Sequence, residues 1–287
     1  MRDLLVYLLV RSAVGLFGLL PAAAARRLGD WGGLIWYLLS GRKVMVRRHL
    51  RRVTQAEPAP EQVRQVFRSY GRYWAETFWV RPRRVSQLDA GLHIDGLEHL
   101  AAVARSGQGA VIVVPHLGNW EAAALSGPRV GLPIVAVAEK LANARLTAWF
   151  TSLREAFGIE ILLNQKGVMR AAEAAIRRGG AVCLLADRDL SGRGVATEFF
   201  GEETTLPAGP VVLAGRTGAP LLTAVCYFTP SGHHLIISPP LELAEGPERL
   251  AQGARAYAER LEASIRSAPE QWHLLQPNWP SDRKARR

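Results

Sequence analysis

The chain has 287 residues, of which 48% are hydrophobic and 21% charged, a balance that excludes wholesale disorder and permits a large buried core. Its two cysteines, Cys183 and Cys226, lack the number and spacing for a disulfide framework or a zinc site, and their apolar surroundings predict small core residues. The formal net charge of +11 favours an anionic partner, namely a nucleic acid, an anionic membrane surface or a phosphate-bearing substrate.

The first segment, residues 4–25, is strongly apolar but is interrupted by Arg11 and Pro21. A membrane-spanning helix needs about 20 uninterrupted apolar residues, and a signal peptide needs an uncharged apolar core. We therefore expect an interfacial or buried helical hairpin. The sequence leaves open whether this segment spans the membrane or lies on it.

Aromatic and basic residues follow this segment. Trp31 and Trp36 precede the run RKVMVRRHLRR at residues 42–52. Aromatic rings beside clustered arginines suit a membrane interface, where the rings lie at headgroup level and the guanidinium groups pair with lipid phosphates. A solvated helix face is the alternative. Nucleic-acid binding is disfavoured because no zinc-finger spacing, RNP-type run or helix-turn-helix signal is evident. We therefore expect contact with the cytoplasmic face of the plasma membrane.

The rest of the chain changes from one long helix to alternating elements. Residues 61–80 have apolar side chains at helical spacing, and Pro82 ends that helix. Five apolar runs rich in β-branched residues then predict strands at residues 110–115, 133–138, 181–186, 219–228 and 234–240. Helix-like stretches lie between and after them, at residues 119–127, 142–158, 168–180, 208–218 and 248–269.

This alternation predicts an α/β fold, with a mostly parallel central sheet flanked by helices on both faces and an N-terminal helical hairpin at the membrane interface. We expect residues 1–60 to form the membrane-associating helical segment. Residues 61–287 should form one compact α/β domain, with a frayed tail at 281–287.

The motif PHLGNWE, at residues 115–121, places His116 at the carboxyl end of a strand, where open α/β sheets bind ligands. Gly118 and Asn119 permit a tight turn, and Glu121 follows in the first turn of a helix. On a regular helix His116 and Glu121 would lie about 140° apart, so they can face one substrate only if the histidine is in the turn. Histidine suits a general base on a hydroxyl, and a carboxylate can hold its tautomer. The motif alone also fits a capping or core histidine.

Further charged residues end other predicted strands. Asp187, Arg188 and Asp189 follow the strand at residues 181–186, and Glu139 follows another strand. If the first of these strands neighbours the one that ends before His116, both line the same crevice. The signatures GxSxG, GxxxxGK[ST] and HExxH are absent from the sequence, as is a GxGxxG after the first strand of the sheet.

Four ordered segments resemble a known family: PHLGNWE, LREAFGIE, LLADRDLSGRGVATEFFGEETTLPAGPVVLAGRTGAPL and IRSAPEQWHLLQPNW. The first resembles the H-x4-D/E signature of glycerolipid acyltransferases. The set resembles the bacterial lipid A late acyltransferase family and, within it, the phosphatidylinositol mannoside acyltransferases of actinobacteria. The resemblance covers nearly the whole chain.

The resemblance implies an O-acyltransferase that moves a fatty acyl group, typically palmitoyl, from acyl-CoA to a mannose hydroxyl of an anionic glycolipid, the phosphatidylinositol mannosides. The same chemistry on a lipid A-type sugar, with acyl carrier protein as donor, stays open, as does a lipid or thioester hydrolase. A non-catalytic membrane- or nucleic-acid-binding protein is a further alternative. Acyl-CoA would be a co-substrate, and no metal or cofactor is expected because a thioester is already activated.

The strand-end positions and the resemblance give candidate catalytic residues, His116 and Glu121. Candidate substrate-binding residues are Arg154, Glu139, Asp187, Arg188, Asn119 and Glu198. The resemblance implies that His116 is the base, that Glu121 orients it or stabilises its charge, and that Arg154 binds phosphate or holds the site together. It implies a polar pocket lined by Glu139 and Asp187, with Glu198 as a further carboxylate. Backbone amides after His116 are the candidate oxyanion donors.

Overall fold

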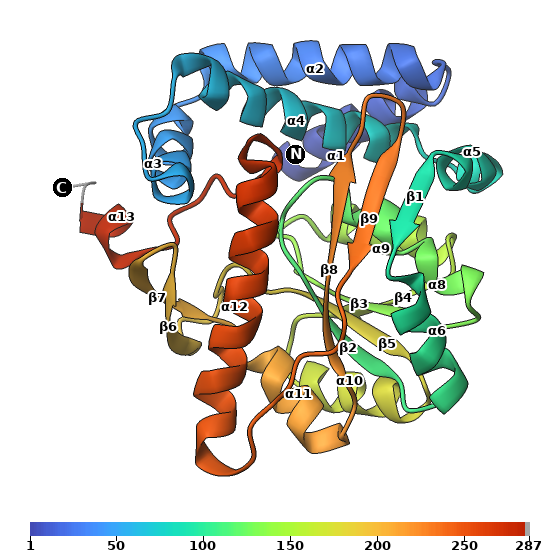
Figure 1. Ribbon diagram of the computed structural model, residues 1–287. Helices are drawn as coiled ribbons and strands as arrows, with labels where there is room; N and C mark the ends of the chain where they lie inside the picture. The colour runs from blue at the N-terminus through green and yellow to red at the C-terminus, as the bar shows by residue number, and fades with distance from the viewer. Residues whose placement is uncertain (285–287) are drawn as a thin grey trace.

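The computed structural model describes residues 1–284, which are built around a seven-stranded sheet with the order β1–β9–β8–β2–β5–β3–β4 (Figure 1). All neighbouring strands are parallel except β8 and β9, which form an antiparallel pair. The strands are β1 (Leu92–Asp95), β2 (Ala110–Val114), β3 (Ile134–Ala138), β4 (Ile159–Leu163), β5 (Ala181–Leu185), β8 (Leu221–Phe228) and β9 (His233–Ile237). A separate antiparallel pair is formed by β6 (Val195–Phe199) and β7 (Glu202–Leu206). The predicted α/β fold with a mostly parallel sheet is confirmed.

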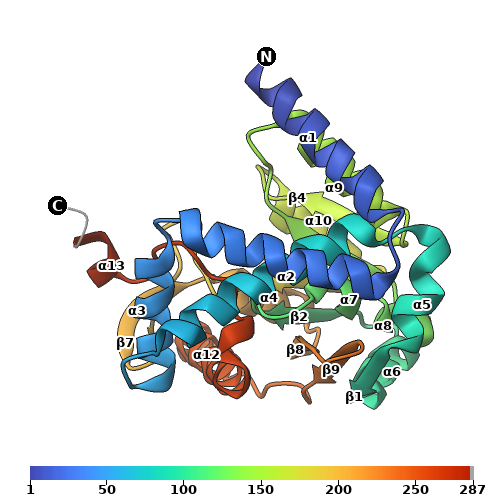
Figure 2. The same cartoon turned by 90° about the horizontal axis from the view of Figure 1, so that it is seen from above.

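Helices cover both faces of this sheet (Figures 1 and 2). They are α1 (Arg2–Phe17), α2 (Ala22–Leu39), α3 (Lys43–Thr54), α4 (Pro60–Trp79), α5 (Val85–Ala90), α6 (Leu97–Ser106), α7 (Trp120–Ala123), α8 (Ser126–Arg129), α9 (Ala144–Glu155), α10 (Val168–Arg177), α11 (Gly209–Thr217), α12 (Arg249–Ser267) and α13 (Pro280–Lys284).

Strand β2 shows why two faces must be covered. All five of its residues are buried, and they alternate between two hydrophobic clusters. Val111 and Val113 pack on the side of α10, α11 and α12, whereas Ile112 and Val114 pack on the side of α4, α5 and α6. A continuous apolar run is the pattern that a doubly covered parallel strand requires. The strand therefore forms the centre of both cores.

The N-terminal helices pack on α4. Helix α2 lies along α4 through glycines, since a Cβ atom on Gly33 would lie 2.1 Å from the carbonyl oxygen of Phe67, and one on Gly71 the same distance from that of Gly29. Helix α1 contacts α4 and α9 and extends away from α2 in Figure 2. Within residues 1–284, no helix combines the length and the apolar character that a membrane span requires.

The expectation of a frayed tail differs from the structure for residues 281–284, and residues 285–287 lie outside the described part of the chain. Helix α13 is anchored by Asp282, which is fully buried and accepts a hydrogen bond from Arg52 at 2.9 Å. The His49 ring lies 3.4 Å from the other carboxylate oxygen of Asp282. These polar contacts with α3 explain why the charged residues 281–284 are ordered.

Candidate active site

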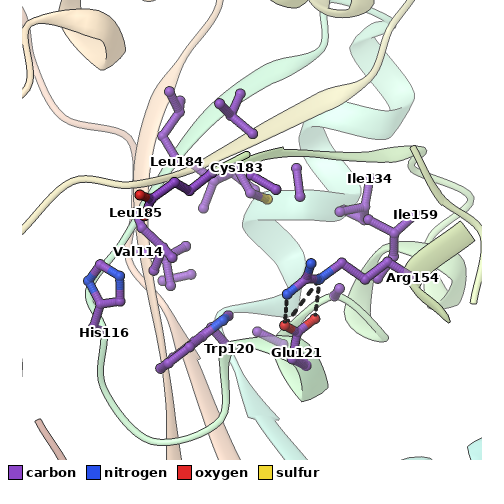
Figure 3. Close-up of a pocket in the computed structure, with 18 of the residues that line it drawn as sticks. Val114, His116, Trp120, Glu121, Ile134, Arg154, Ile159, Cys183, Leu184 and Leu185 are labelled. Atoms are coloured by element: carbon purple, nitrogen blue, oxygen red, sulfur yellow. Dashed lines mark hydrogen bonds and ion pairs between the residues drawn. The ribbon is translucent and has the colours of Figure 1, made fainter. Parts of the chain in front are cut away.

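A cavity of about 420 Å³ opens beside the carboxyl ends of β2, β3 and β5 (Figure 3). This volume lies in the range of ligand-binding pockets. Its apolar wall crosses the sheet, with Leu235, Ala224, Ile112, Cys183 and Ile134 contributed by the neighbouring strands β9, β8, β2, β5 and β3. Burial raises the pKa of the Cys183 thiol to about 12, so this cysteine lines the cavity as a neutral, apolar group and not as a nucleophile.

His116 lies at the wall of this cavity, and its partner is Asp187. The His116 Nδ1 atom is 2.7 Å from Asp187 Oδ1, and the backbone N–H of His116 donates to Oδ2 at 3.1 Å. The residues meet because β2 and β5 are parallel neighbours with Val114 paired to Leu185. His116 is 30% exposed and Asp187 is fully buried. The condition set by the sequence, that these two strands be neighbours, is therefore met.

Asp187 is held as a carboxylate. Burial by itself would raise its pKa, but the charge and hydrogen bond of His116 and a 2.8 Å bond from the Trp272 indole N–H outweigh burial and lower the pKa. An ionised Asp187 fixes the proton of a neutral His116 on Nδ1 and leaves Nε2 as a proton acceptor. His116 and Asp187 thus form a buried-carboxylate and histidine pair suited to general base catalysis.

The segment after α12 fixes the His116 loop from a second side. Trp272 bonds to Asp187, and the backbone N–H of His273 donates to the His116 carbonyl at 2.7 Å. Burial, with the His116 charge, lowers the pKa of His273 to about 3, so His273 is a weak proton acceptor at neutral pH. In the sequence this segment stands out only through its resemblance to the family, since nothing local shows that Trp272 touches a residue 85 positions away.

Glu121 lies on α7 and is paired with Arg154 of α9. The Arg154 Nε–H donates to the two carboxylate oxygens at 3.1 and 3.0 Å, and the Tyr73 hydroxyl donates to Glu121 at 3.3 Å. The Glu121 carboxylate raises the pKa of Arg154 against the opposite effect of burial. Figure 3 shows Trp120 between His116 and this ion pair.

The structure therefore differs from the expectation that Glu121 contacts the histidine. Among residues 1–284, the carboxylate bonded to the His116 ring is Asp187, and Glu121 bonds to Arg154 and Tyr73. The reason is that α7 starts after a turn that sends Glu121 toward α9. Both residues nevertheless line one cavity, as the turn geometry predicted.

The other candidate residues fall into two groups. Arg188 and the exposed Glu139 line the cavity, whereas Asp187 lies behind His116 and does not line it. Asn119 is buried as the N-cap of α7, where its side chain accepts from the backbone of Ala122 at 3.2 Å. Glu198 is exposed on β6 opposite Glu203 and is not among the lining residues, so the expected carboxylate near the base is Asp187 and not Glu198.

The backbone amides after His116 are already used. Those of Leu117, Gly118 and Asn119 donate to the carbonyls of Pro115, Gln271 and Cys226 at 2.7, 2.9 and 2.8 Å. Gly118 has a φ of 60°, and a Cβ atom there would lie 2.0 Å from the Cys226 oxygen. These amides shape the loop, and the expectation that they form an oxyanion hole is not supported by their geometry.

Comparisons with known proteins show the family of this chain. The family profile described as "Bacterial lipid A biosynthesis acyltransferase" matches residues 2–281. The chain is 34% identical over 270 residues to a phosphatidylinositol mannoside acyltransferase of Mycolicibacterium smegmatis, covering 92% of this chain and 88% of that protein. It is 36% identical to the protein of the same name from Mycobacterium tuberculosis, covering 92% and 85%.

A more distant relative has a different name. A lipid A biosynthesis acyltransferase of Haemophilus influenzae is 28% identical over 181 residues, covering 62% of this chain and 55% of that protein. The match to the family profile extends over nearly the whole chain, and the mycobacterial relatives cover it almost as fully. The chain therefore belongs to the bacterial lipid A biosynthesis acyltransferase family and is an O-acyltransferase.

Proposed function

We propose that the protein transfers a palmitoyl-length acyl group from acyl-CoA to a mannose hydroxyl of phosphatidylinositol mannosides at the cytoplasmic face of the plasma membrane. The observation that carries the proposal is the His116–Asp187 pair at the wall of a long apolar cavity. The names of the mycobacterial relatives support the acceptor.

The reaction follows from this geometry. The His116 Nε2 atom accepts the proton of the mannose hydroxyl as that oxygen attacks the carbonyl carbon of the thioester. Asp187 accepts the Nδ1–H bond and stabilises the imidazolium that forms. When the C–S bond breaks, the imidazolium returns its proton to the thiolate of CoA. The products are an ester and a free thiol, and His116 ends neutral.

The extent of the cavity supports the proposal that the transferred acyl chain is long. Its lining residues come from β9, β8, β2, β5, β3 and β4, and six neighbouring strands at a spacing of about 4.8 Å extend over roughly 24 Å. Ile159 of β4 lines it near the Glu121–Arg154 pair in Figure 3, and Leu235 of β9 lies on the opposite side of the sheet order. In the proposed complex, the extended acyl chain lies across the strands on this apolar surface.

The outer surfaces of α1 and α2 support membrane contact. Large apolar side chains there are exposed, among them Leu5 at 59%, Leu9 at 62% and Trp31 at 63%. Exposed apolar patches on a protein surface often mark sites that bind another protein or a membrane. Together with the net positive charge, they support binding of an anionic lipid surface, where the acceptor lipid resides.

The test is release of CoA thiol from palmitoyl-CoA, with and without a mannosylated phosphatidylinositol, for the wild type and His116→Ala. We expect release that requires the acceptor and is lost in the variant, together with formation of the acylated glycolipid. Release without acceptor would indicate a hydrolase. Transfer only from acyl carrier protein would overturn the proposed donor. Transfer only to a lipid A-type sugar would overturn the proposed acceptor. Unchanged turnover by His116→Ala would overturn the proposed base.

A further inference from the structure

A second group of chemically distinctive side chains lies on the edge of the sheet. His93 and Asp95 belong to the edge strand β1, and His234 belongs to its neighbour β9 (Figure 1). The parallel register pairs His93 with His234. Since alternate residues of a strand share a face, Asp95 projects to the same side as His93.

This group faces away from the acyl-transfer cavity. On β9, Leu235 and Ile237 line the cavity, so His234 lies on the opposite face of the sheet. On β1, Ile94 packs into the core, whereas its neighbours His93 and Asp95 are exposed. None of the three lines the cavity. The group therefore needs an explanation that does not involve acyl transfer.

The donor atoms are spaced as ligands of one ion. The His93 Nε2 atom is 3.2 Å from Asp95 Oδ1, the His234 Nε2 atom is 2.7 Å from Asp95 Oδ2, and the donor atoms of the three residues lie within 4.8 Å of one another. Two ligands bound to a tetrahedral zinc ion at about 2.0 Å are roughly 3.3 Å apart. Small side-chain rotations at this exposed site would bring three donors around one centre.

The chemistry of the donors selects the ion. Two imidazoles and one carboxylate suit zinc and related divalent transition ions, whereas Mg²⁺ and Ca²⁺ prefer an all-oxygen shell. Side-chain exposures of 73%, 54% and 31% for His93, Asp95 and His234 leave room for an ion and for water as a further ligand.

We propose that His93, Asp95 and His234 form a surface site for a zinc-type divalent ion that joins the edge strand β1 to β9. On binding, the ion takes the lone pair of each Nε2 atom, and the single proton of each neutral imidazole is then on Nδ1. Strand β1 has only four residues, so an ion that bridges it to β9 would strengthen the attachment of this edge strand to the sheet. This inference does not depend on the proposed acyl transfer.

The test is titration of Zn²⁺ into tag-free, chelator-treated full-length protein, followed by calorimetry. We expect one equivalent to bind to the wild type, and affinity to fall at least about tenfold in His93→Gln and in His234→Gln. The matched control His99→Gln changes a nearby histidine of α6 outside the group, and His116→Ala removes the partly buried histidine of the active site. Both should bind Zn²⁺ as the wild type does.

Two further measurements distinguish the loss of a metal-binding side chain from the loss of the native fold. Zn²⁺ should raise the melting temperature of the wild type but not that of the His93→Gln/His234→Gln double variant, since an ion bound only to the native state stabilises it. Far-UV circular dichroism of the variants without metal should match the wild type. Absence of saturable Zn²⁺ binding, or binding that survives the double variant, would overturn the site and leave a surface His–Asp–His hydrogen-bonded group.

Discussion

Asp187 determines which nitrogen of His116 carries the proton, and Asp187→Asn tests this role. An asparagine that keeps the bond from Trp272 would direct its amide N–H toward Nδ1 of His116. The histidine proton would then sit on Nε2, which could no longer accept one. We expect kcat to fall about 100-fold or more with a smaller change in KM, measured as acceptor-dependent thiol release.

The matched control for this variant is Asp189→Asn. Asp189 lies in the same loop but accepts bonds from Ser191 and from the backbone of Gly194. Among the described residues it forms no hydrogen bond or ion pair with His116, whose carboxylate partner is Asp187. Its substitution should leave kcat near the wild-type value, and full activity in Asp187→Asn would show that the buried carboxylate does not serve the base.

A second residue-scale prediction concerns the Glu121–Arg154 pair, whose side chains are each 20% exposed. Removing one partner leaves the other charge in a poorly solvated place, whereas removing both does not. We expect Glu121→Gln and Arg154→Met each to lower the free energy of unfolding by about 2–3 kcal/mol, and the double variant to lose less than the sum. Urea denaturation of the four proteins measures this; strict additivity would contradict a coupled pair.

The difference between the expected and observed partners of His116 has a simple physical origin. Local sequence shows that Glu121 is five residues away, and it shows that both His116 and Asp187 end strands. It does not show the order of strands in the sheet, which brings residue 187 to residue 116. The sequence and the family resemblance thus indicated His116, Glu121 and Arg154 as separate candidates, whereas the pairs that form among the site residues depended on long-range packing.

At the scale of elements, some strands can likewise be predicted from local sequence, whereas others depend on their neighbours in the fold. The five apolar runs were predicted because a doubly covered strand is continuously hydrophobic, as β2 shows. Strands β1, β4, β6 and β7 were not predicted. The sequences of β1 and β7, LHID and EETTL, contain charged or polar residues, since β1 is an edge strand and β7 belongs to a two-stranded pair. Their existence depends on a neighbouring strand more than on their own composition.

The packing of α2 on α4 gives an element-scale prediction with an internal control. A methyl group on Gly33 would collide with the Phe67 carbonyl at 2.1 Å, whereas one on Gly32 has no neighbour within 4 Å. We expect Gly33→Ala to lower the free energy of unfolding by about 1–3 kcal/mol through overpacking. Gly32→Ala should raise it by up to about 1 kcal/mol, because alanine favours the helix. Thermal or urea unfolding distinguishes the two, and equal effects would contradict the close contact.

Glu76 joins several elements through buried charges. Its carboxylate lies 2.9 Å from Arg26 of α2, 3.0 Å from Arg72 of α4 and 2.7 Å from His233 of β9. Burial opposes ionisation, but the His233 hydrogen bond and the surrounding positive charges outweigh it and lower the pKa of Glu76 from 4.5 to about 2. These ion pairs of Glu76 therefore stabilise the native state only while Glu76 is ionised.

The resulting pH dependence has a defined sign. A lowered native pKa contributes stability that is complete above the unfolded value of 4.5 and is lost as pH falls toward about 2. We expect Glu76→Gln to be less stable than the wild type at pH 6, with the difference shrinking by about 3 kcal/mol by pH 2. Chemical denaturation at several pH values measures this. Glu98→Gln, at an exposed site on α6, should show no such change with pH. If the stability difference between Glu76→Gln and the wild type stayed constant with pH, it would contradict the stabilising role of ionised Glu76.

At the scale of the whole molecule, the exposed apolar surface of α1 and α2 is connected to the active site through hydrogen bonds. Deleting α1 would be an unclear test, because the Asp3 carbonyl accepts a 2.7 Å bond from Asn143 and the Val14 carbonyl accepts from Arg81. Since Asn143 caps α9, which carries Arg154, a deletion would disturb the site as well as the surface. Substitutions on the exposed side of α1 avoid this problem.

Leu5 and Leu9 are one helical turn apart on α1 and are 59% and 62% exposed. Burying both in a lipid interface would contribute about 2 kcal/mol, so Leu5→Gln/Leu9→Gln should weaken binding to vesicles of anionic lipid by about tenfold or more. Leu250→Gln, on α12, is the matched control and should bind as the wild type does. Turnover of a water-soluble mannoside acceptor should be equal in all three proteins, because the changes lie outside the cavity. Equal vesicle binding by all three would show that α1 does not contact the membrane.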